Sequence, residues 1–297
     1  MEEKWNGTAE AAGRRERWWR TAADLVAFMV LFGVLMVLVG MPVIALGFGN
    51  EMREIVPGSV PIPLMMAQEV LMLVCTLLAV WILLRFGMPF TGLGLSLKGR
   101  GKDWIAGTLF AIVLYLFGFG LSLLLGVVEV TDVSFDASSL LMSLLLFLLV
   151  GVAEETMMRG FVLGRLLDGG VNRFVALFIS STSFSLMHFF NPNFEFLPFL
   201  NILLAGVLLG ASYIYTRNLC FPVALHWFWN WLQGPVLGYE VSGNRFGDTL
   251  LTLRLSDAHL MNGGSFGFEG SLLCTFLLII GSGLIIGHYE RKIRRFP

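Results

Sequence analysis

Eight long apolar segments divide this chain and limit what it can fold into. They occupy residues 23–48, 62–86, 104–128, 138–167, 172–190, 196–215, 219–237 and 271–288. A largely apolar helix of about 20 residues is long enough to cross the hydrocarbon core of a bilayer. Only 14% of the 297 residues are charged, whereas soluble domains carry about 25%. The sequence therefore predicts an all-α, polytopic membrane protein with about eight transmembrane helices.

The charged residues between these segments predict how the chain sits in the membrane. Basic residues gather at both termini and in the 87–103 connection, and acidic residues gather in the 129–137 connection. By the positive-inside rule, both termini are expected on the cytoplasmic side of the cell (inner or plasma) membrane. The expected parts are a basic, tryptophan-containing arm (1–22), one membrane-embedded domain (23–290, with a functional core at about 138–237) and a basic tail (291–297).

Composition also argues against several classes of function. The formal net charge of −1 gives no indication of nucleic-acid binding. The three cysteines, Cys75, Cys220 and Cys274, lie far apart without a C-x-x-C motif, so neither a disulfide framework nor a thiolate zinc site is expected. The polar 238–270 connection is a candidate lid, although no motif in it supports that role.

The fourth segment carries charges that a membrane helix does not usually tolerate. Glu154, Glu155 and Arg159 follow a run of uncharged residues, and each charge at a helix centre costs roughly 2.5–3.5 kcal/mol. Glu155 and Arg159 are four residues apart, so they share a helix face and can pair. Glu154 points about 100° away from that face and is predicted to be free for chemistry. Two alternative interpretations remain. Both glutamates could be held in one hydrogen-bonded network, or these charges could mark a helix end at the membrane surface.

Two further segments carry polar residues at the same four-residue spacing. His188 follows Phe184, and Asn230 follows His226. We expect these side chains to meet Glu154 in a common polar cavity within the membrane. A carboxylate and a histidine can activate a water molecule, and a histidine with an asparagine amide can stabilise an oxyanion. This set suits hydrolysis of an amide by water, because no serine or cysteine lies in an evident nucleophile motif.

Zinc is the alternative use of the same residues. Glu154, His188 and His226 could hold a zinc ion with one position open. However, the chain has no H-E-x-x-H motif, and Asn230 is a poor zinc ligand. We therefore expect no cofactor, with zinc as the alternative.

In order and spacing, these residues resemble the three-motif signature of the CAAX prenyl-protease family, also called the type II CAAX endopeptidase or CPBP family. That family includes bacteriocin-processing and self-immunity members. The resemblance covers about residues 138–237. The matching motifs are Glu154-Glu155-x-x-x-Arg159, Phe184-x-x-x-His188 and His226-x-x-x-Asn230.

The resemblance implies an intramembrane endopeptidase with an eight-helix core. Eukaryotic relatives remove the last three residues from prenylated C-a-a-X proteins. By the motif match, Glu154 and His188 would activate water, while His226 and Asn230 would bind the oxyanion. The remaining motif residues would support them: Glu155, Arg159 and Phe184. The family is described both as metalloproteases and as glutamate-dependent enzymes without metal.

The expected partners are the lipid bilayer and a hydrophobic or lipid-modified protein or peptide substrate, with no nucleic acid. One alternative is a non-catalytic membrane partner or self-immunity protein on the same fold. A proton-coupled transporter is less favoured, because the sequence has no inverted repeats or paired broken helices.

Overall fold

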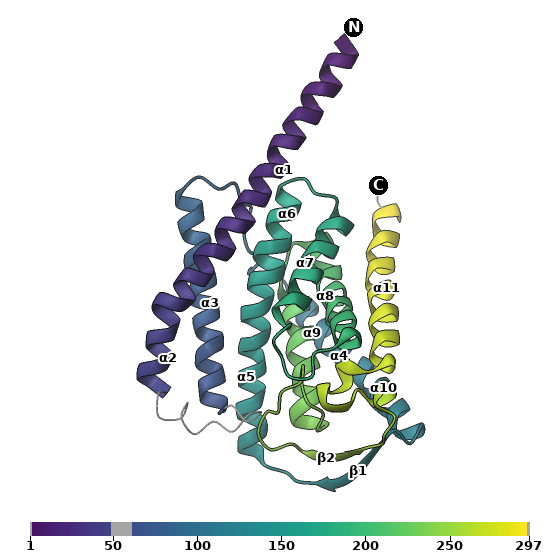
Figure 1. The fold of residues 1–297 in the computed structure, drawn as a ribbon. Coiled ribbons are helices and arrows are strands. Elements are labelled where there is room, and N and C mark those ends of the chain that lie inside the picture. Colours follow the sequence, from purple (N-terminus) through teal and green to yellow (C-terminus); the bar gives the residue numbers. More distant parts are fainter. Residues whose placement is uncertain (1, 49–60, 296–297) are drawn as a thin grey trace.

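The computed structural model describes the backbone of residues 2–48 and 61–295, with side chains from residue 18 onward. Most of the expected amino-terminal arm, the acidic connection at 49–60, and residues 296–297 of the basic tail therefore lie outside the described side chains. The described chain forms a bundle of helices (Figure 1). The α-helices are α1 (Glu2–Leu35), α2 (Met41–Phe48), α3 (Ile62–Arg85), α4 (Gly101–Leu124), α5 (Ala137–Glu155), α6 (Gly164–Asp168), α7 (Arg173–Met187), α8 (Phe196–Thr216), α9 (Cys220–Trp231), α10 (His259–Asn262) and α11 (Leu272–Arg295).

Three π-helical turns make longer helices out of these pieces. Met36–Gly40 joins α1 to α2, Thr156–Leu163 joins α5 to α6, and Leu232–Val236 extends α9. Every predicted apolar segment is thus largely helical, which confirms the all-α, polytopic membrane fold. Among the described residues, six helices are long and apolar enough to cross a membrane: 18–48, 62–85, 101–124, 137–168, 196–216 and 272–295.

The other two predicted spans are shorter helices. α7 has 15 residues, and at 1.5 Å per residue this falls short of the roughly 30 Å hydrocarbon core. It begins where the Asn172 side chain accepts a hydrogen bond from the Phe174 amide, and it ends just before His188. α9 has 12 residues before its π-helical turn, and most of its side chains are buried. α9 is therefore an interior element of the bundle, whereas α7 exposes one side, which carries Phe174, Val175, Phe178 and Leu186.

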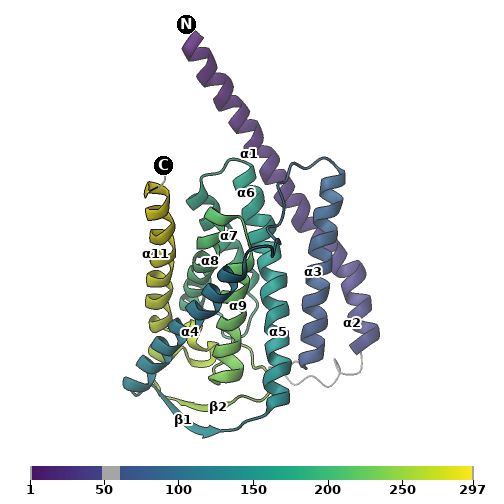
Figure 2. The same ribbon diagram turned by 180° about the vertical axis from the view of Figure 1, so that it is seen from behind.

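A small antiparallel sheet lies where the sequence indicated only polar connections. β1 (Val128–Val133) pairs with β2 (Leu251–Leu255), and the register between Val130 and Asp132 is shifted. The sheet lies at the end of the bundle opposite both termini (Figures 1 and 2). It joins the connection before α5 to the 238–270 connection, which is therefore a folded segment rather than a free loop.

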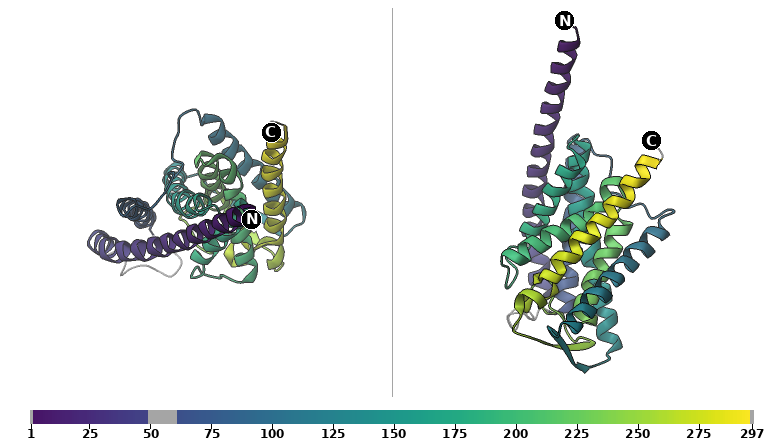
Figure 3. Two further views of the ribbon diagram at one scale, coloured as in Figure 1. Left: turned by 90° about the horizontal axis from the view of Figure 1, so that it is seen from above. Right: turned by 90° about the vertical axis from the view of Figure 1, so that its right-hand side faces the viewer.

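α9 occupies the middle of the bundle. It packs against α4, α5 and α8, and α8 packs in turn against α7 and α11. α1 and α3 lie at one edge, while α11 runs along the opposite outer side (Figures 2 and 3). Close approach of α4 to α9 depends on Gly107, where an added Cβ atom would lie 2.5 Å from the carbonyl oxygen of Phe221.

We predict that Gly107→Ala lowers the thermal unfolding midpoint of the protein in detergent, because overpacking of this kind costs about 1–3 kcal/mol. Gly120→Ala is the matched control in the same helix, since a Cβ atom there meets nothing within 4 Å. The midpoint of the control is expected to stay the same or rise slightly. Equal midpoints for the two variants would contradict the close helix contact.

Candidate active site

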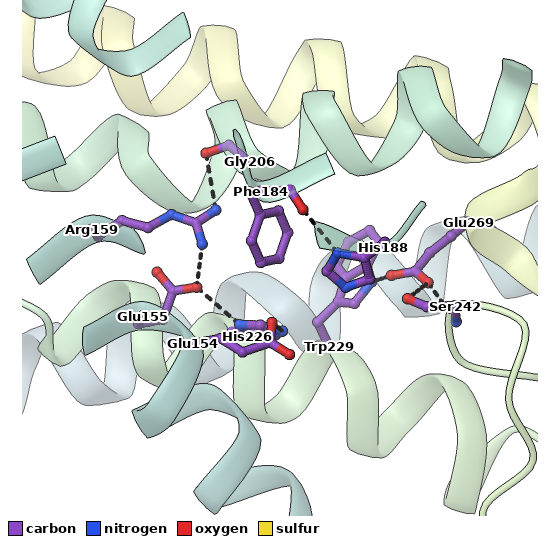
Figure 4. A network of polar contacts seen from close by, with 10 residues as sticks. All are labelled: Glu154, Glu155, Arg159, Phe184, His188, Gly206, His226, Trp229, Ser242 and Glu269. Atoms are coloured by element: carbon purple, nitrogen blue, oxygen red, sulfur yellow. Dashed lines mark hydrogen bonds and ion pairs between the residues drawn. The ribbon is translucent and has the colours of Figure 1, made fainter. Parts of the chain in front are cut away.

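A fully buried carboxylate, Glu155, is the centre of the site (Figure 4). Its Oε1 atom accepts a 2.7 Å hydrogen bond from Nη1 of Arg159, as the four-residue spacing predicts. Nδ1 of His226 lies 2.9 Å from the same oxygen. Because a carboxylate only accepts hydrogen bonds, Nδ1 of His226 is the donor. This arrangement turns Nε2 of the imidazole toward the cavity.

Arg159 is also buried, and three elements satisfy its guanidinium. Besides Glu155, it donates 3.2 Å from Nη2 to the carbonyl oxygen of Gly206 on α8. Its guanidinium carbon lies 4.3 Å from the centre of the Phe184 ring on α7, a cation–π contact. Gly206 permits this arrangement, because an added Cβ atom would lie 2.8 Å from the Cα atom of Ser181.

Glu154 is separate from the Glu155–Arg159 pair. Its Oε2 atom lies 3.8 Å from Nε2 of His226 and has no hydrogen-bond partner among the described residues. Its side chain is 15% exposed, whereas that of Glu155 is 0% exposed. The two glutamates therefore differ in exposure and in partners, while each keeps a buried Oε2 atom without a hydrogen-bond partner among the described residues.

His188 and Asn230 complete the polar set. Nδ1 of His188 lies 2.9 Å from the carbonyl oxygen of Phe184, so Nδ1 donates there and Nε2 is left free. The ring centres of Phe184 and His188 are 4.8 Å apart, as their four-residue spacing allows. Asn230 is buried one turn after His226 on α9, and no hydrogen bond of its side chain occurs within the described part of the chain.

All four predicted catalytic side chains line one cavity of about 230 Å³. Glu154, His188, His226 and Asn230 reach it from α5, the end of α7 and α9. The rest of the wall is mostly apolar and includes Met65, Phe147, Val150, Met187 and Ile202. The cavity thus combines polar groups of acid–base character with a surface suited to an apolar chain.

Two further carboxylates line the same cavity and were not among the predicted site residues. Glu69 on α3 has a buried Oε2 atom without a partner among the described residues. An ionisable residue within an apolar segment was a signal for it. Glu269 lies beyond the apolar segments in a glycine-rich stretch, where no periodicity or spacing indicated a role.

The alternative use of the site is zinc binding by Glu154, His188 and His226. Within the described residues, no three His, Cys, Asp or Glu side chains gather closely enough to hold a metal ion. Nδ1 of His226 and Nδ1 of His188 are both engaged in hydrogen bonds within the protein. These bonds leave the Nε2 atoms of both imidazoles unengaged, as in metal-ligating histidines, so zinc held by Glu154, His188 and His226 stays the alternative.

We predict that Arg159→Met lowers the stability of the protein by about 3–5 kcal/mol, because it leaves a buried carboxylate without its cation. Arg254→Met is the matched control, since Arg254 pairs with Glu129 where both side chains are more than half exposed. An exposed pair contributes about 0–1 kcal/mol. Thermal unfolding in detergent compares the two. Similar losses of stability in the two variants would contradict a larger contribution from the buried pair.

Comparison with known proteins bears on the same segment. Residues 136–232 match the family model described as type II CAAX prenyl endopeptidase Rce1-like. No curated protein and no solved structure gives a significant match to the chain. The matched stretch contains α5, α7, α8 and α9 and with them every residue of the three motifs. Residues 136–232, which make up less than half of the chain, are therefore similar to the Rce1-like family of type II CAAX prenyl endopeptidases.

Proposed function

We propose that the protein is an intramembrane endopeptidase. Its substrate is a membrane-associated protein or peptide cleaved near the C-terminus, and a prenylated C-a-a-X protein is one candidate. The observation that carries this proposal is the free oxygen of Glu154 beside His226, in a cavity that His188 and Asn230 also line. The family match supports a CAAX-type protease in general terms.

In the proposed reaction, Glu154 takes a proton from water and His188 orients that water through its free Nε2 atom. The resulting hydroxide attacks the carbonyl carbon of the peptide bond. The carbonyl oxygen becomes an oxyanion, which the Asn230 amide and Nε2–H of His226 stabilise. The tetrahedral intermediate then breaks its C–N bond, and the proton held by Glu154 passes to the leaving amine.

Charge balance supports the donor role of His226. Glu154 and Glu155 carry two negative charges and Arg159 one positive charge. An imidazolium at His226 balances these three groups, with Nδ1–H on Glu155 and Nε2–H toward Glu154; Glu69 and Glu269, which line the same cavity, are not counted in this sum. Buried charges are tolerated when they are paired in this way.

We also propose that both termini face the cytoplasm in the cell membrane. The last turn of α11, which carries Lys292, Arg294 and Arg295, lies at the same end of the bundle as the start of α1 (Figure 1). The acidic residues of β1 and of the turn before α5 belong to the opposite end. This distribution follows the positive-inside rule.

We predict that Glu154→Gln abolishes cleavage of a prenylated C-terminal peptide by the purified protein, with a loss of about 10²–10⁴-fold or more. Glu129→Gln on the exposed β1 strand is the control for removing a carboxylate and is expected to keep wild-type activity. His188→Ala and His226→Ala are expected to lose activity as well. Wild-type cleavage by Glu154→Gln would rule out the mechanism.

Treatment with a metal chelator tests the cofactor. Because the described donors do not form a metal site, we expect the cleavage rate to be unchanged after incubation with a zinc chelator. Loss of activity that added zinc restores would instead show that the enzyme uses the metal.

A further inference from the structure

Glu269 is the most heavily bonded carboxylate among those that line the cavity (Figure 4). It lies in a short 3₁₀ turn, Phe268–Gly270, and is only 4% exposed. Its Oε1 atom accepts a 3.0 Å hydrogen bond from Nε1 of Trp229. Its Oε2 atom accepts bonds from the amide (2.9 Å) and hydroxyl (2.8 Å) of Ser242 and from Nε2 of Gln233 (3.3 Å).

These donors come from two parts of the cavity wall. Trp229 lies on α9 between His226 and Asn230, and Gln233 lies in the π-helical turn that follows. Ser242 belongs to a segment after α9, residues 241–246, which we call the cap. Cap residues Val241, Ser242, Asn244 and Phe246 line the cavity. One carboxylate therefore joins the cap to the helix that carries two of the proposed catalytic residues.

The backbone that carries Glu269 is itself held in place from α8. The fully buried Asn201 donates from Nδ2 to the carbonyl oxygens of Glu269 (2.7 Å) and Ser271 (2.9 Å). Its Oδ1 atom accepts a 2.6 Å bond from the hydroxyl of Thr275 on α11. Gly267 has a positive φ of 90°, and an added Cβ atom there would lie 1.8 Å from the carbonyl oxygen of Glu240. Glu269 is thus attached to a fixed base, not to a mobile loop.

The bonding of Glu269 distinguishes it from the other cavity carboxylates. Both of its oxygens accept hydrogen bonds from the protein, whereas Glu69 and Glu154 each have an Oε2 atom without a partner among the described residues. A carboxylate occupied by four donors has little capacity left for a water molecule or a substrate group. Its position suits it to orient other residues.

We propose that Glu269 is a positioning residue that fastens the cap over the cavity and fixes the α9 turn bearing His226 and Asn230. The cap and Glu269 both lie outside residues 136–232, so the cavity of this protein is completed by segments beyond the family match. The catalytic part of this inference rests on the proposed endopeptidase function. The structural part, in which Glu269 holds the cap in place, does not depend on that function.

The first test measures access to the cavity and needs no substrate. Val150→Cys places a thiol in the cavity wall, and its labelling by a water-soluble maleimide is followed in detergent, with the parent protein giving the background of the three buried cysteines. We expect Glu269→Ala to speed labelling about tenfold or more, because hydrogen bonds to a charged group are lost. Glu129→Ala is the control, since that exposed side chain pairs with Arg254 of β2, outside the cap and away from Glu269.

Ser242→Ala provides a second variant in case Glu269→Ala fails to fold, because it removes only the hydroxyl that donates to Glu269. A smaller increase in labelling, in the same direction, is expected. Labelling of both variants at the rate of the Glu129→Ala control would overturn the proposal that Glu269 holds the cap in place.

The second test concerns catalysis of the prenylated peptide. We expect Glu269→Gln to lower kcat by about 10²-fold, because a shift of about 1 Å in a catalytic group has an effect of that size. Trp229→Phe keeps an aromatic ring but removes the indole N–H that donates to Glu269, and it is expected to lower kcat less than Glu269→Gln does. A merely structural role would reduce the amount of folded protein and leave kcat per folded molecule unchanged, which would overturn the positioning role.

The two tests separate this inference from the proposed function. Faster labelling without any peptidase activity in the wild-type protein would support the fastened cap and contradict the endopeptidase. Activity that depends on Glu154 but not on Glu269 would support the endopeptidase and contradict the positioning role.

Discussion

The buried carboxylate of Glu155 is the interaction on which the rest of the site depends. A carboxylate inside a membrane protein is tolerated only with charged or hydrogen-bonded partners. Here the partners come from two directions, with Arg159 one turn later in the same long helix and His226 on α9. Arg159 extends the contact to Gly206 on α8 and Phe184 on α7. One ionised group thereby fixes four helices around a common point.

This arrangement also determines which groups remain available for chemistry. Because Glu155 holds Nδ1 of His226, the other nitrogen of the ring faces Glu154 and the cavity. Glu154 keeps an oxygen without a partner among the described residues, and His188 keeps a free Nε2 atom. On the far side of the cavity, Glu269 uses both of its oxygens to hold the cap and Trp229. Neighbouring carboxylates thus differ in the hydrogen-bond donors around them.

The sequence predicted the parts of the site that depend on local spacing. The Glu155–Arg159 pair and the Phe184–His188 contact follow from four-residue spacing on one helix. Contacts between residues far apart in the chain have no such spacing in the sequence and were not predicted. Asn201 reaches Glu269 across 68 residues, and β1 pairs with a β2 strand hidden in a polar connection. In the sequence, Glu69 is only an isolated charge in an apolar segment. Its place in the cavity wall depends on how α3 packs against α5.

The thermal unfolding midpoints of Glu154→Gln and Glu155→Gln, measured in the same detergent, test the division between a bracing and a working carboxylate most directly. Glu155→Gln is expected to lower the midpoint strongly, because it breaks a buried ion pair and the bond to His226. Glu154→Gln is expected to leave the midpoint unchanged or raise it, because working residues are often held at some cost in stability. A loss for Glu154→Gln equal to or greater than that for Glu155→Gln would contradict the division of roles.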